Sequence, residues 1–113
     1  MGNIKPGTAI SDALKQYKIQ LEQLNKIKLE LASMSKGDSA RGDLVKQQTA
    51  LNNQIRGTKN YITGSGNQNY IDMMNSAAAE SQAQLQQRLQ KQINDYKNKA
   101  QKMVQDLQSS LSK

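Results

Sequence analysis

The residue types that most often carry out chemistry in proteins are scarce in this chain. Its 113 residues include no His and no Cys, which removes the usual general base at neutral pH, the thiolate nucleophile and the soft metal ligands. The nine acidic residues are scattered among bases, and the nearest loop pair, Asp38 and Asp43, reads more simply as part of a solvated turn than as a metal or acid–base site. We therefore expect no enzymatic activity, no metal and no cofactor.

The segment "TGSGNQN" is the other candidate for chemistry, because Gly-rich loops can cradle phosphate groups. No Lys-Ser/Thr pair follows it, and no strand pattern precedes it. Gly64 and Gly66 can adopt the positive φ angles that a reversal between helices needs, and Asn67 tolerates them or caps a helix. The sequence therefore predicts a turn over residues 63–69, formed by Gly64, Gly66 and Asn67.

The net charge of +7 raises the question of nucleic acid, a membrane surface or an acidic partner. Residues 1–66 carry ten Lys/Arg against five acids and residues 67–113 carry six against four, so neither end forms a dense basic tail. Such interleaved charges are typical of a solvated helix face. A basic coiled-coil assembly or nucleic-acid-associated protein of phage or plasmid origin stays open as the alternative, with phosphate contacts from Lys and Arg.

The chain also lacks the long apolar segments that targeting and membrane insertion require. Its N-terminus, "MGNIKPGTAI", has no apolar signal-peptide core, and no window approaches the ~20 apolar residues of a membrane span. We expect no membrane span, and a cytoplasmic protein or one exported without cleavage of a signal peptide.

Apolar periodicity supplies the elements on which a binding surface would lie. Residues 8–34 carry apolar side chains at alternating spacings of four and three, with a mean step of about 3.4 residues that favours coiled-coil packing. A weaker pattern covers 42–62, either as a second helix or as a continuation of the first. Residues 70–112 contain no Gly or Pro and predict one long helix.

Together these elements predict a single all-α domain spanning residues 1–113. The expected fold is an elongated antiparallel helical hairpin, with a first arm that is one helix or is broken into two, and a long C-terminal helix. If the two parts of the first arm are roughly collinear, they match the ~60 Å length of the last helix at ~1.5 Å per residue. The last helix would then pack antiparallel along everything before the turn.

A two-helix hairpin leaves part of each apolar stripe uncovered unless another chain packs against it. We therefore predict binding of a helical protein partner, or of a second copy in a homodimer, through coiled-coil-like contacts. The sequence does not separate the residues of the protein's own core from those that contact a partner. The predicted partner-binding residues are Leu14, Leu21, Leu24 and Ile27 in the first helix, and Leu85, Leu89, Ile93, Tyr96 and Met103 in the last.

The Cys-free hairpin pattern, with "TGSGNQNYIDMMNSAAAESQAQL" after the first arm, resembles the small WxG-like proteins of type VII secretion. In particular it is similar to the small helical companions of LXG toxins, which bind the toxin's helical N-terminal domain. The resemblance implies an adaptor for a larger secreted toxin or a pair with a sister small protein. The chain has no Trp, and Tyr96 is followed four residues later by Ala100 where the export signature of the family has an acid. The resemblance therefore implies a companion that does not itself carry the export signal.

Overall fold

The computed structural model describes residues 4–112 and consists of three α-helices in chain order. Helix α1 spans Ile10–Ser33, α2 spans Arg41–Gly64 and α3 spans Gln68–Leu111. The molecule measures 71 × 30 × 15 Å, and its radius of gyration of 19.8 Å exceeds the ~13 Å expected of a compact chain of this length. The prediction of an elongated all-α fold with a broken first arm and a long C-terminal helix is confirmed.

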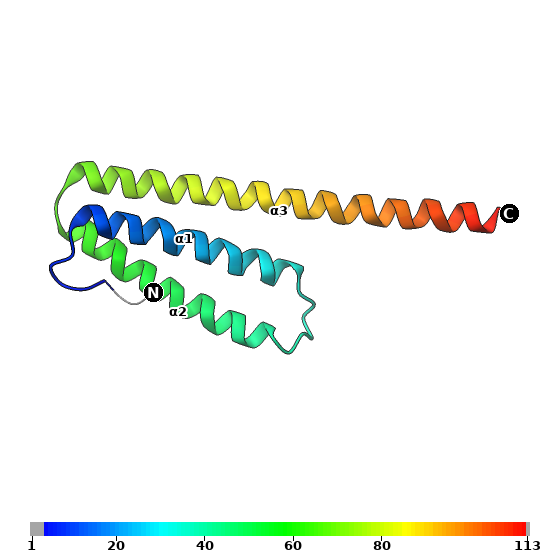
Figure 1. Ribbon diagram of the computed structural model, residues 1–113, viewed down its shortest axis with the longest axis horizontal. Coiled ribbons are helices and arrows are strands. Elements are labelled where there is room, and N and C mark those ends of the chain that lie inside the picture. Colours follow the sequence, from blue (N-terminus) through cyan, green and yellow to red (C-terminus); the bar gives the residue numbers. More distant parts are fainter. Residues whose placement is uncertain (1–3, 113) are drawn as a thin grey trace.

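The first two helices are not collinear. The segment 34–40 reverses the chain, so α2 runs back along α1, and α3 is parallel to α1 and antiparallel to α2 (Figure 1). The expected packing of α3 along both parts of the first arm is therefore wrong. Periodicity fixes which face of each helix is apolar, but not whether the loop around Gly37 bends or reverses the chain.

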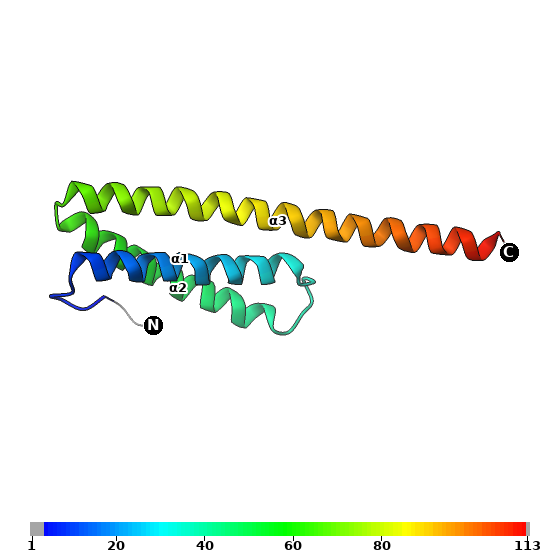
Figure 2. The ribbon, with the colours of Figure 1, turned by 45° about the horizontal axis from the view of Figure 1, so that its top comes forward.

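Helix α1 lies between the other two and packs against both. Helices α2 and α3 meet mainly near the short turn that connects them and diverge from there (Figures 1 and 2). The core sits at this turn end, where Ala13, Leu14 and Tyr17 of α1 contact Ile62 of α2 and Met74 of α3. The partly buried Ala77 and Ala78 pack against the same cluster, so the small side chains of α3 allow α1 to approach closely.

Side-chain hydrogen bonds hold the ends of the helices. Helix α3 begins after Asn67, whose Oδ1 accepts a hydrogen bond from the Tyr70 N–H at 3.4 Å. At the C-terminal end of α1, the Arg41 guanidinium donates a hydrogen bond to the Leu31 carbonyl at 3.0 Å. This carbonyl belongs to the last turn of α1, where acceptors have no partner within the helix. The Tyr61 hydroxyl donates to the Thr8 carbonyl at 2.7 Å and ties the N-terminal lead to α2.

The turn between α2 and α3 is shorter than predicted and covers residues 65–67. Gly66 has the positive φ of 70° that the reversal needs. Gly64 does not, because it lies in the last turn of α2 with a right-handed backbone. Of the three predicted turn residues, Gly66 and Asn67 therefore have the predicted roles, and Gly64 ends the preceding helix.

Candidate protein-binding surface

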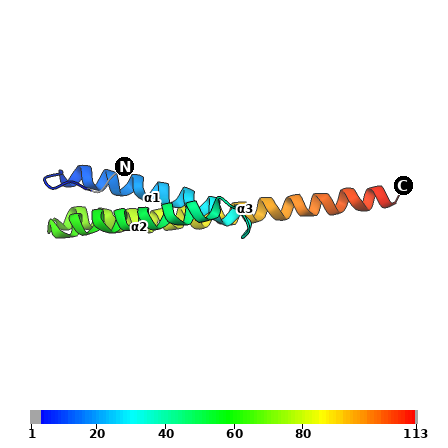
Figure 3. The same cartoon turned by 90° about the horizontal axis from the view of Figure 1, so that it is seen from below.

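The length of α3 creates the most unusual surface of the protein. With 44 residues it is about 66 Å long, whereas α1 and α2 have 24 residues each and reach only about 36 Å. The start of α1, the end of α2 and the start of α3 lie at the same end of the molecule, so the C-terminal half of α3 runs on alone past its neighbours (Figure 3). We call residues 91–111 the α3 extension.

Side chains along the extension are exposed throughout. Every residue from Lys91 to Ser112 is exposed, so the rest of the described chain buries none of them. Six of these residues are large and apolar, with exposed fractions between 48% and 78%. We call them the extension stripe: Ile93, Tyr96, Met103, Val104, Leu107 and Leu111.

The extension stripe occupies one side of the helix. At ~100° per residue, Ile93, Tyr96, Met103, Leu107 and Leu111 fall within an arc of about 80°, and Val104 widens it to about 100°. Earlier in the helix, the α1-facing residues Met74, Ala78 and Ser81 centre about 60° away around the helix axis, and the partly buried Leu85 and Leu89 lie between them and the stripe. A packing face therefore continues past the point where its intramolecular partner ends.

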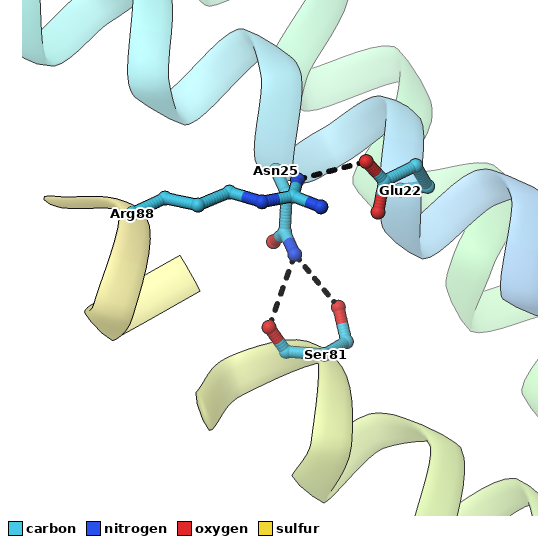
Figure 4. Close-up of polar contacts among 4 residues, drawn as sticks. All are labelled: Glu22, Asn25, Ser81 and Arg88. Atoms are coloured by element: carbon cyan, nitrogen blue, oxygen red, sulfur yellow. Dashed lines mark hydrogen bonds and ion pairs between the residues drawn. The ribbon is translucent and has the colours of Figure 1, made fainter. Parts of the chain in front are cut away.

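The boundary between the covered and uncovered parts of α3 is marked by polar contacts with α1. Asn25 is buried, and its Nδ2 donates to the Ser81 carbonyl at 3.0 Å and to the Ser81 hydroxyl at 2.9 Å (Figure 4). Two turns further along α3, an Arg88 guanidinium nitrogen lies 2.8 Å from Glu22 Oε1. The Arg88 and Glu22 side chains are 41% and 40% exposed, so this ion pair adds little stability.

A notch follows directly after these contacts. It is lined by Ala32 and Ser33 at the end of α1 and by Leu89, Ile93 and Tyr96 on α3. The notch therefore lies where α1 ends and the α3 extension continues without a neighbouring helix.

The predicted partner-binding residues divide between the body and the extension. Leu14 and Leu24 are buried inside the protein, and Leu21 packs against the core cluster. Three more are partly buried: Ile27 on α1, and Leu85 and Leu89 on α3. Ile93, Tyr96 and Met103 are exposed on the extension. The structure therefore separates an internal set from an external set, which the sequence alone did not.

Three buried polar residues, Asn25 described above and the pair Gln20 and Thr58, were absent from the predicted set. Gln20 and Thr58 have no exposed surface, and the Thr58 hydroxyl lies 2.9 Å from Gln20 Oε1 and 3.1 Å from the Gln54 carbonyl. Gln20 Nε2 has no hydrogen-bond partner within the described chain. Spacing does carry a signal for Gln20, because Ala13, Tyr17, Gln20 and Leu24 follow the same alternation of four and three as the apolar stripe.

Within residues 4–112, other kinds of site are not assembled. No three acidic side chains come together in a way that would hold a metal ion, and none of the helices has the apolar length needed to cross a bilayer. Desolvation by burial raises the pKa of the core residue Tyr17 above its ordinary value of 10.0.

Comparison with known protein families, with curated proteins and with solved structures finds no match to this chain.

Proposed function

We propose that this protein is a non-enzymatic adaptor that binds a helix of another protein along the extension stripe. The observation that carries the proposal is the uncovered α3 extension, 21 residues of helix with six large apolar side chains on one side. A lone amphipathic helix gains little stability in water by itself, because most helical stability in proteins comes from packing its apolar face. A partner helix would supply that packing.

The spacing of the stripe specifies the kind of partner. Spacings of three and four residues alternate along four residues of the stripe and Ala100, in the order Ile93, Tyr96, Ala100, Met103 and Leu107. This is the pattern of a seam between two helices. A surface of this kind fits another amphipathic helix better than it fits a small molecule or a flat sheet. We infer that the partner is a helical domain.

The partner class that we propose is the helical domain of a larger secreted toxin exported by type VII secretion, or a sister small protein. This part of the proposal rests on the resemblance to the small WxG-like companions. The body of the protein, formed by α1, α2 and the first half of α3, would then be a rigid support. The extension would be the part that binds the toxin.

The charges of the extension support an apolar contact over a phosphate track. Lys91, Lys97, Lys99 and Lys102 are interspersed along the helix with Asp95 and Asp106. Phosphate binding would require a row of cations without interspersed acids. An apolar seam would hold as salt rises, whereas phosphate binding would weaken steeply.

The test is capture of a partner by the tagged full chain from its native host at about 0.3 M salt, where exposed charges are screened over less than ~10 Å. We expect recovery of a protein with a helical N-terminal domain. Leu107→Asp should abolish the recovery, because it places a charge on the apolar seam. Ile19→Asp is the matched control, since Ile19 is an apolar residue of the body that is 48% exposed.

Two results would contradict the proposal. The first is recovery of the same helical partner by the Leu107→Asp variant and by the unaltered chain to an equal extent. The second is recovery of nucleic acid alone, detected by its absorbance and lost as salt is raised, which would favour the basic assembly protein.

A further inference from the structure

The sequence of the α3 extension specifies what can lie against it in more detail than an apolar stripe alone. Ile93, Ala100 and Leu107 recur every seven residues, with Tyr96 and Met103 between them. Positions with this spacing form the interior layers of a two-stranded coiled coil, and each residue packs between residues of the facing helix. The size of each layer residue therefore restricts the residue that can face it.

A second copy of the extension satisfies these size restrictions only in one direction. In a parallel, in-register pair, Ala100 would face Ala100 and leave a gap, while Tyr96 would face Tyr96. In an antiparallel pair centred between residues 101 and 102, Ala100 faces the other copy's Met103, and Leu107 faces the other copy's Tyr96. In the two central layers the small Ala100 then opposes the larger Met103, which is how tightly packed helix pairs fill their cores.

The charges beside the seam favour the same direction. Lys99 and Asp106 occupy equivalent positions, each one residue before an interior layer residue. Equivalent flanking positions lie opposite each other in an antiparallel pair, so Lys99 of each copy lies beside Asp106 of the other. In the parallel pair Lys99 would instead lie beside Val104, and Asp106 beside Leu111, which gives no charge pairing.

The end of α1 agrees with this register. In the antiparallel pair, the last turn of the second copy, at Ser110 and Leu111, lies beside Ile93. Ile93 borders the notch at the end of α1, together with Ala32 and Ser33. The C-terminal end of the second copy's extension therefore lies next to the end of α1. Each copy covers the ~30 Å of α3 that the body of the other leaves uncovered.

We propose that two copies of this chain associate through antiparallel pairing of their α3 extensions in the register centred between residues 101 and 102. The inference rests on the proposed function in one respect, that the extension stripe is a helix-binding surface. Since the second copy and a foreign helix occupy the same stripe, the homodimer and the adaptor complex exclude one another. The homodimer is the form in which the stripe is covered before the partner arrives.

Sedimentation equilibrium of the purified full chain, from about 1 to 200 µM at physiological salt, tests the association. We expect a reversible monomer–dimer equilibrium in this range, because the seam has only three heptads. Lys99→Asp should weaken the dimer about tenfold, since two attractive pairs become repulsive ones. Asp106→Lys should weaken it similarly. Lys91→Asp, on the side opposite the stripe, is the control and should change the dissociation constant less than twofold.

Mixing the two weakened variants tests the direction of the pairing. In an equimolar mixture of Lys99→Asp and Asp106→Lys chains, an antiparallel heterodimer carries two restored pairs of opposite charge. We expect the mixture to dimerise about tenfold more tightly than either variant alone. A parallel pair would show no such recovery, because Lys99 and Asp106 do not meet in it.

A chain that stays monomeric at 200 µM would overturn the self-association, and charge variants that associate as the unaltered chain does would overturn the proposed antiparallel register. Either result leaves the proposed function standing if Leu107→Asp still abolishes capture of a helical partner. Conversely, a dimer with the expected charge dependence, combined with capture that is insensitive to Leu107→Asp, would support the inference and overturn the proposed function.

Discussion

The buried contact between Gln20 and Thr58 predicts an unequal response to two substitutions that each remove one side of it. Thr58→Val keeps the shape of the side chain but removes its hydroxyl, so the whole Gln20 amide is left without a partner at zero exposure. An unsatisfied buried polar group costs roughly 1–3 kcal/mol. We expect Thr58→Val to lower the free energy of unfolding by about that amount.

Gln20→Met should cost far less than Thr58→Val. The substitution removes an amide whose Nε2 already lacks a hydrogen-bond partner in residues 4–112, and it leaves the Thr58 hydroxyl bonded to the Gln54 carbonyl at 3.1 Å. An unbranched apolar side chain of similar length fills the same space. We expect a change within about 1 kcal/mol, in the stabilising direction, since a buried polar group is replaced by an apolar one.

The double variant completes the cycle. With Gln20→Met already present, Thr58→Val should cost less than about 1 kcal/mol, which corresponds to a coupling of about 1–2 kcal/mol between the two sites. Urea unfolding followed by tyrosine fluorescence is a suitable assay, because Tyr17, Tyr61 and Tyr70 all belong to the core region and the chain has no Trp. Protein at about 1 µM limits self-association. Equal costs for the two single variants, with additive behaviour in the double variant, would refute this reasoning.

Further predictions concern the turn, the core and pH. Gly57→Ala should stabilise the protein by about 1 kcal/mol, because Gly57 lies inside α2 with open space around an added Cβ. Gly66→Ala should destabilise it by about 1 kcal/mol, because Gly66 has a positive φ. The midpoint temperatures of thermal unfolding should therefore shift in opposite directions. Ile62→Ala, at a side chain with no exposed surface, should cost about 2–5 kcal/mol in urea unfolding, while Leu107→Ala, at 62% exposure, should change the stability of the monomer by less than about 0.5 kcal/mol. Burial raises the pKa of Tyr17, so the unfolded chain loses this proton first; the associated stability is present below pH 10 and is lost as pH rises through the folded-state pKa. Tyr17→Phe should therefore lose less stability between pH 9 and pH 11.5 than the unaltered chain, and an equal loss would contradict this assignment.

Much of the helical architecture could be predicted from residue spacing. The three helices, the break near Gly37 and the turn at Gly66 follow from apolar periodicity and from residues that favour turns. Their direction could not be predicted, because periodicity identifies a packing face without saying which helix covers it. The reversal of α2 depends on contacts between residues far apart in sequence, such as Gln20 with Thr58.

The candidate binding surface could be predicted only in part. Ile93, Tyr96 and Met103 were identified from their spacing, but the same spacing also selected Leu14 and Leu24, which are buried in the body. Nothing in the local sequence distinguishes the two groups, because a coiled-coil seam inside a chain and one between chains use the same residues. The difference arises from length: α1 ends at Ser33, and α3 continues beyond it.

Hydrogen exchange along α3 is the measurement that tests the central claim most directly, because it reports separately on the covered and uncovered parts of one helix. In dilute monomeric protein, we expect the amides of residues 91–111 to exchange much faster than those of residues 70–85, which pack against α1. On binding a helical partner, or on association of two copies at high concentration, the 91–111 amides should gain protection while those of α2 stay unchanged. Strong protection of residues 91–111 in the monomer, or binding that leaves their exchange unaltered, would contradict the assignment of the α3 extension as the binding surface.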